Sequence, residues 1–185
     1  SHRPADGLHA SRRAVSGSEV TDQEALLKPE GPVVTDHHGE TRIVLESEAI
    51  RRSIRNGDEA WLRRVAAALA NLQAVTPADG LPGDAGETAK AWSQAHREFD
   101  VALYSACDSL WLMRFIDTLS KRCERYRRAA GQLANAFATW VNEHDAIYAA
   151  AARRDDSAAV RVLEGHLRGT AQLVEEHLQD ALGLD

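Results

Sequence analysis

The fold class is decided by the segment TRIVLESEAIRRSIRNGDEAWLRRVAAALANLQ, residues 41–73. Its apolar residues recur at the three- and four-residue spacing that places them on one face of an α-helix. The pattern is interrupted once, at Asn56 and Gly57, a pair typical of a helix end. Asp58 follows as a candidate N-cap, and the apolar stripe of a second helix starts at Trp61. The segment therefore predicts two amphipathic helices joined by a tight turn.

Helical spacing continues through the rest of the chain. Four more helices are expected: from about Thr88 to Cys107, after a cap at Asp108 or Ser109, from about Ala134 to Arg153, and after a cap at Asp155 or Asp156. No stretch of useful length alternates apolar and polar residues as a half-buried strand would. The sequence therefore predicts an all-α protein, an antiparallel bundle of six to seven helices over residues 41–182.

The first 40 residues differ in composition from the remainder. They are polar, lack helical periodicity over any length, and contain Pro29, Gly31 and Pro32 close together. We expect an irregular N-terminal segment or linker here, with the adjacent His37 and His38 as solvated loop residues. This segment also cannot supply a complete winged helix-turn-helix, a DNA-binding module.

Charge and composition exclude several classes of function. The net charge of −6 argues against this chain itself gripping nucleic acid or an anionic membrane surface, since both need a basic patch. No apolar run is long enough to span a bilayer, and the N-terminus lacks the apolar core of a secretory signal. The two cysteines, Cys107 and Cys123, are too few for a disulfide framework. A reducing, cytoplasmic location is the simplest interpretation.

Four polar residues occupy positions where the apolar stripes predict core. They are His96 and Asp100 on one predicted helix, His144 on the next but one, and His166 on the last. His96 and Asp100 are four residues apart and project from one helix face. Three imidazoles and a carboxylate pointing inward suit a divalent transition metal, which would also offset the cost of burying the Asp. Histidines satisfied by hydrogen bonds within a helical core remain the alternative at this point.

Several motifs resemble one family in order and spacing. They are R-I-V-L-E-S-E-A (42–49), W-x-x-x-H-R-E-F-D-V-A-L-Y-S-A-C-D-S-L-W-L (92–112), L-x-x-R-C-E-R-Y-R-R (119–128), E-H-D-A-I-Y-A-A-A-A-R-R-D (143–155) and A-x-x-x-L-E-G-H-L (159–167). Together they resemble the FCD domain, the C-terminal effector-binding domain of GntR-type transcriptional regulators of the FadR subfamily. The resemblance covers about residues 42–180 and implies a helical bundle that encloses a ligand cavity.

The resemblance also implies a metal site. Family members hold a divalent metal through an acidic residue, a histidine one turn later, and two histidines on later helices. The matching positions here are His96, Asp100, His144 and His166. The first two are exchanged relative to the family pattern, since the histidine precedes the carboxylate. Three histidines and one aspartate are retained, so zinc is the first expectation, with nickel and manganese also compatible.

The partners follow from the same resemblance. Effectors of these domains are small organic acids, whose carboxylate would pair with an arginine in the cavity. Arg42, at the position of the family's opening arginine, is a candidate, as are Arg125 and Arg127. We also expect a homodimer, no membrane partner, and DNA contact only through a winged helix-turn-helix that these residues do not include.

Two other functions compete with a ligand-sensing domain. A metal-dependent, hydrolase-like enzyme could use the same ligands with a glutamate as general base. Glu98 and Glu143 lie near the ligands in sequence, but their positions on the helices point them elsewhere. A metal-free structural helical dimer would need the three histidines only as satisfied core residues. We therefore expect no catalytic residue and no enzymatic activity.

Overall fold

The computed structural model describes residues 33–76, 86–129 and 137–182, and the side chains of residues 39–76, 86–124 and 142–173. These ranges form six helices: α2 (Val33–Asn56), α3 (Glu59–Val75), α4 (Gly86–Tyr104), α5 (Leu110–Ala129), α6 (Phe137–Ala152) and α7 (Asp156–Leu182). No strand occurs in the described ranges. The all-α class expected from the sequence is confirmed.

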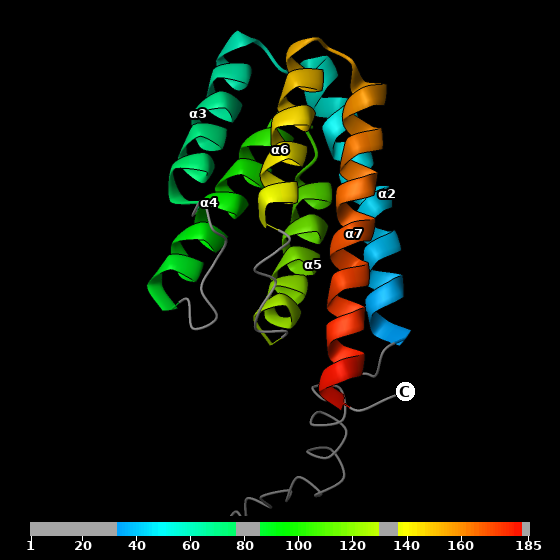
Figure 1. Cartoon of the computed structure of the whole chain (residues 1–185). Helices are drawn as coiled ribbons and strands as arrows, with labels where there is room; N and C mark the ends of the chain where they lie inside the picture. The colour runs from blue at the N-terminus through cyan, green and yellow to red at the C-terminus, as the bar shows by residue number, and fades with distance from the viewer. Residues whose placement is uncertain (1–32, 77–85, 130–136, 183–185) are drawn as a thin grey trace, which may run out of the picture. The chain divides into compact units, whose positions relative to one another are not determined.

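The helices form an antiparallel bundle in which successive elements run in opposite directions (Figure 1). α2 packs along α7, α3 along α4, and α6 along α7, so the two ends of the described chain lie side by side. α5 packs mainly on α2. This arrangement surrounds a core of buried side chains from all six helices, including Ile50, Trp61, Val65, Phe99, Leu103, Ile116, Ile147 and Leu163.

The first helix begins earlier than the sequence pattern predicts. α2 starts at Val33 rather than near Thr41, so His37 and His38 lie in a helix and not in a loop. Their side chains lie outside the described residues. At Gly39 the backbone of α2 lies close to α7, since a Cβ there would be only 3.2 Å from the Cβ of Ala171. Periodicity does not predict these turns, because residues 33–40 show no apolar stripe.

Side-chain caps fix the starts of three helices. Asp58 accepts a hydrogen bond from the backbone N–H of Trp61 at 2.7 Å, as expected for the N-cap of α3. Ser109 Oγ accepts from the N–H of Leu112 at 3.3 Å and caps α5. Asp155 Oδ1 accepts from the N–H of Ala158 at 2.8 Å and caps α7. The sequence offered Asp108 or Ser109 as the cap of α5, and Asp155 or Asp156 as the cap of α7. The capping residues are Ser109 and Asp155.

Gly57, between α2 and α3, leaves room for the ring of Trp61. A Cβ on Gly57 would lie 2.3 Å from Cε3 of Trp61 and 2.6 Å from the carbonyl oxygen of Ser53. The Trp61 ring is buried and its Nε1 donates a hydrogen bond to the carbonyl of Ala102 at 3.1 Å. Gly57 does not have a positive φ, so close packing rather than a left-handed backbone requires glycine here.

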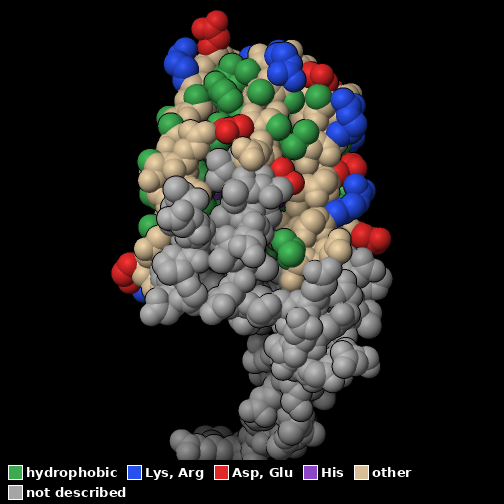
Figure 2. Space-filling view, viewed as in Figure 1, with side chains coloured by type: hydrophobic (Ala, Val, Ile, Leu, Met, Phe, Trp, Pro, Cys, Tyr) green, Lys and Arg blue, Asp and Glu red, His purple; other side chains and the backbone are tan. Residues whose placement is uncertain are grey.

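The surface carries charges of both signs. On the face shown in Figure 2, basic and acidic side chains are interspersed over the described part of the chain. None of the described helices combines the length and apolar character needed to cross a membrane.

Candidate metal centre

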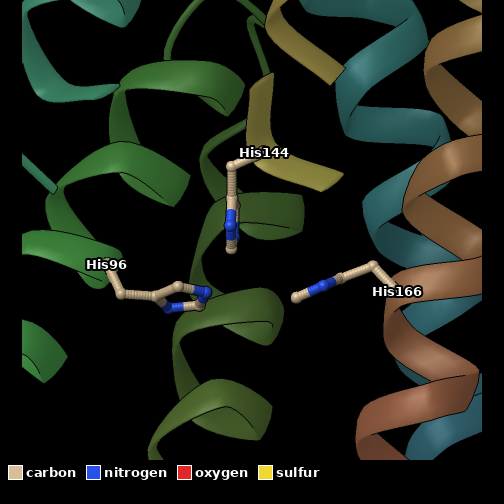
Figure 3. A group of neighbouring side chains, drawn as sticks. All are labelled: His96, His144 and His166. Carbon is tan, nitrogen blue, oxygen red and sulfur yellow. The ribbon is translucent and has the colours of Figure 1, made fainter. Parts of the chain in front are cut away.

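Three buried histidines from three helices meet inside the bundle. His96 of α4, His144 of α6 and His166 of α7 are 5%, 1% and 7% exposed. One ring nitrogen from each lies within 4.8 Å of the corresponding atom of the other two. Figure 3 shows the three side chains directed toward a common point. The convergence predicted from sequence therefore holds for the histidines.

Aromatic side chains shape the wall behind this cluster. The ring of Trp92, one turn before His96, stacks on it with centroids 4.9 Å apart. Phe99 meets the His144 ring edge-on at 5.1 Å. The His144 centroid lies 4.8 Å from that of His96 and 4.8 Å from that of His166. Imidazole ligands suit a transition metal better than a hard cation such as magnesium.

Asp100 lies beside the cluster rather than within it. Its Oδ2 is 3.5 Å from Nδ1 of His96, and its side chain is 20% exposed. It does not belong to the group whose ligand atoms lie within 4.8 Å of one another. The 3.5 Å separation is long for a charge-assisted hydrogen bond. It is close to the spacing of about 3.4 Å between two ligands on one tetrahedral ion with bonds near 2.1 Å.

Glu143 makes a short contact that the sequence did not reveal. Its Oε2 lies 2.7 Å from Nδ1 of His166, although the two residues are 23 apart in the chain and lie on α6 and α7. From its helical position Glu143 was expected to point away from the ligands, and for this residue the expectation is wrong. Its position next to His144 in the chain was the available signal, but the pairing depends on how α6 and α7 align.

A cavity of about 480 Å³ opens beside the histidines. His96, Asp100 and His166 form part of its wall, together with side chains from α2, α4, α5 and α7. This volume is within the range of small-molecule sites in proteins. The bundle therefore contains a pocket next to its histidine cluster, as the resemblance implied.

Arg42, one of the arginines expected in the cavity, does line it. Its Nε donates to Glu46 Oε1 at 2.7 Å, and the buried Glu46 also accepts a hydrogen bond from the Tyr104 hydroxyl at 2.9 Å. Burial is the largest single influence on Arg42 and alone would lower its pKa, but the combined attraction of the acidic groups around it, Glu46 first, outweighs burial, and the pKa is raised. Burial, followed by the Glu46 charge, raises the pKa of Tyr104 well above its ordinary value. Arg42 is therefore cationic and Tyr104 is a neutral hydrogen-bond donor.

The other two arginines cannot be placed in the same way. Arg125 and Arg127 belong to α5, but their side chains lie outside the described residues.

Residues 39–169 match the FCD domain family. The chain belongs to the FCD domain family. It is 34% identical over 182 residues to a protein from Paraburkholderia xenovorans (strain LB400) described as an uncharacterized HTH-type transcriptional regulator, BphR, covering 90% of this chain and 74% of that protein. The FCD domain of this chain is thus similar to part of a protein described as a transcriptional regulator.

A solved structure shares the fold of the FCD domain. It is the crystal structure of a transcriptional regulator, a GntR family member, from Pseudomonas syringae pv. tomato str. DC3000, with a TM-score of 0.65 and 24% sequence identity. The match covers 84% of this chain and spans 61% of the length of that protein. At this identity the likeness concerns the fold alone.

Proposed function

We propose that this FCD domain senses a small organic acid through a protein-bound divalent metal. The observation that carries the proposal is the meeting of His96, His144 and His166, each on a different helix and each buried. When ligands come from separate helices, binding of an ion and its effector favours one packing of those helices over another.

The proposed ligands are the three histidines with Asp100 as the fourth. The imidazoles and one carboxylate suit zinc first, with nickel and manganese also compatible. The distance of 3.5 Å from Asp100 Oδ2 to His96 Nδ1 is compatible with both atoms binding one ion. A bound ion supplies Lewis acidity and coordination positions for an acidic ligand, while the protein orients that ligand and excludes water from it.

The cavity has groups that suit a carboxylate effector. Arg42 is charged and lines the pocket, and its Nη groups are separate from the Nε that bonds Glu46. Thr170 also lines it and is 6% exposed, and its hydroxyl has no hydrogen-bond partner among the described residues. A polar ligand would supply that partner. Arg125 and Arg127 remain further candidates on α5.

The regulator would act in the cytoplasm on DNA through a winged helix-turn-helix outside these residues. The mixture of acidic and basic side chains on the face shown in Figure 2 fits a sensor better than a DNA-binding surface. Binding at the histidine cluster would change the relative packing of α4, α6 and α7 and so alter the DNA affinity of the attached module.

The first test is metal and acid binding by the purified domain. Zinc at about 100 times its Kd should stabilise the protein by about 2.7 kcal/mol and raise the melting temperature by about 5–10 °C. A series of small carboxylic acids, titrated calorimetrically with and without zinc, should contain ligands that bind only the zinc-loaded protein. A domain that binds neither zinc, nickel nor manganese would contradict the proposal.

Asp100→Asn tests the fourth ligand. Loss of the anionic oxygen should weaken zinc binding on the order of 100-fold, measured by competition with a chelating dye. Asp117→Asn is the matched control, because Asp117 also lines the cavity but pairs with Arg97 and Lys121. Unchanged zinc affinity in the Asp100→Asn protein would show that the histidines suffice and that Asp100 is not a ligand.

A homodimer is also proposed, through an exposed apolar face of α5. Leu110, Trp111 and Phe115 are 65%, 67% and 55% exposed, and the Trp111 and Phe115 rings lie 6.3 Å apart. Exposed aromatic clusters of this kind mark protein interfaces. The inner side of the same helix contributes Ile116 to the core. A helix that has apolar residues on two opposite faces typically packs against a neighbour on each of them.

Replacing Trp111 and Phe115 together with serine should convert the dimer to monomer. Light scattering should give twice the 20.2 kDa chain mass for the wild type and the chain mass itself for the variant. Val44→Ser is the control, since Val44 is 69% exposed on α2. A wild-type protein that stays monomeric at high micromolar concentration, or a variant that still dimerises, would refute this interface.

A further inference from the structure

The short contact between Glu143 and His166 distinguishes one histidine of the cluster from the other two. Glu143 Oε2 lies 2.7 Å from His166 Nδ1, within the range of a charge-assisted hydrogen bond. The Glu143 side chain is 28% exposed and that of His166 is 8% exposed. The carboxylate therefore reaches from the partly solvated side of α6 to the buried ring on α7.

This contact favours one of the two tautomers of the His166 ring. A neutral imidazole has one N–H and one lone pair, and an ionised carboxylate can only accept. With Glu143 accepting at Nδ1, the proton lies on Nδ1 and the lone pair lies on Nε2. A metal needs the lone pair, so the opposite tautomer would present an N–H to the ion instead.

We infer that Glu143 is a positioning residue that holds His166 in the Nδ1–H tautomer and presents its Nε2 to the metal. The inference rests on the proposed metal function but adds a residue outside the predicted ligand set. Carboxylates that support metal-bound histidines in this way affect affinity without touching the ion.

The two carboxylates near the cluster then have different roles. Asp100 is 3.5 Å from His96 Nδ1, a spacing suited to two ligands of one ion, whereas Glu143 is within hydrogen-bonding distance of its histidine. α6 carries both His144 and Glu143. One helix thus supplies a ligand and also orients a ligand of the neighbouring helix, before any ion binds.

The experiment compares Glu143→Ala, Glu143→Gln and wild-type protein by two measurements. Long-range ¹H–¹⁵N spectra of the metal-free protein report the tautomer of His166, and competition with a chelating dye reports zinc affinity. Glu98→Ala is the control, because Glu98 also lies near a ligand in sequence but bonds the exposed side chains of Asn71 and Gln94.

In the wild type and in Glu143→Gln, His166 should be protonated at Nδ1, since the amide oxygen of glutamine also accepts a hydrogen bond. Glu143→Ala should lose this tautomer and bind zinc about 10–100-fold more weakly. The Glu98→Ala protein should match the wild type in both measurements. A merely structural role for Glu143 would not change the tautomer.

Two results would overturn the inference, and they separate it from the metal proposal. If zinc binds the wild type but Glu143→Ala keeps the Nδ1–H tautomer and full affinity, Glu143 does not position His166, and the metal site stands. If the wild type binds no zinc, nickel or manganese, both proposals fail together.

Discussion

Replacing His144 with alanine should abolish the metal binding that we propose for this domain. His144 is 1% exposed and its ring centroid lies 4.8 Å from that of His96 and 4.8 Å from that of His166, so its loss removes one of the three converging imidazoles. Loss of one of three imidazoles should lower zinc affinity by at least about 1,000-fold, equivalent to about 4 kcal/mol. Zinc should then give no rise in melting temperature, because the ion no longer binds the native state preferentially. Scanning calorimetry with and without zinc, and metal analysis after dialysis, measure the two effects.

A control is needed because removing a buried ring also leaves a cavity. Ile147→Ala supplies it, since Ile147 is 1% exposed on the same helix but is not a ligand. That variant should lose about 2–5 kcal/mol of stability and still gain the full stabilisation by zinc. If His144→Ala retained its zinc, the histidine cluster would be a packing feature of the core and not a metal centre.

Gly57→Ala should be among the most damaging single-methyl changes available in this chain. The new Cβ would lie 2.3 Å from the Trp61 ring and 2.6 Å from the Ser53 carbonyl oxygen, so either the ring or the backbone must move. The ring has little freedom, because it is buried and its Nε1 bonds the Ala102 carbonyl. We expect a loss of about 3 kcal/mol in the free energy of unfolding, measured by urea denaturation.

The matched control for this change is Gly169→Ala. Gly169 lies within α7, and a Cβ there would meet nothing within 4 Å. Alanine at a helical position of this kind should stabilise the protein by about 0.5–1 kcal/mol. Equal effects of the two substitutions would show that Trp61 yields easily, and that Gly57 is present for another reason.

Periodicity predicted the helices because each of them buries one face. The pattern cannot show where a helix continues without an apolar stripe, so it does not predict the turns of α2 before Thr41. At Gly39 the backbone of α2 lies close to Ala171 of α7, which the local sequence does not record. The same limit applies to Gly57, which was interpreted as a helix terminator. Its role as space for a ring depends on the packing of Trp61, which no local pattern records.

In the candidate site, too, some features can be predicted from the sequence pattern and others depend on how the helices pack. Burial of the three histidines could be predicted because each interrupts an apolar stripe, and their convergence follows from the bundle. The Glu143–His166 pair could not be predicted, because it depends on the alignment of two helices. The resemblance indicated Arg42, and its pairing with Glu46 has the i,i+4 spacing of an ion pair within one helix. The hydrogen bond from Tyr104 to Glu46 follows only from the packing of α2 against α4.

The contact between α2 and α7 also has a mechanical consequence. α7 carries His166, and five residues further along Ala171 touches Gly39 near the start of α2. With 24 residues, α2 is about 36 Å long. A tilt of α2 by about 5° would move one end by about 3 Å relative to the other. α2 is therefore long enough to act as a lever, because a small rotation would move its ends much farther than the residues near the pivot.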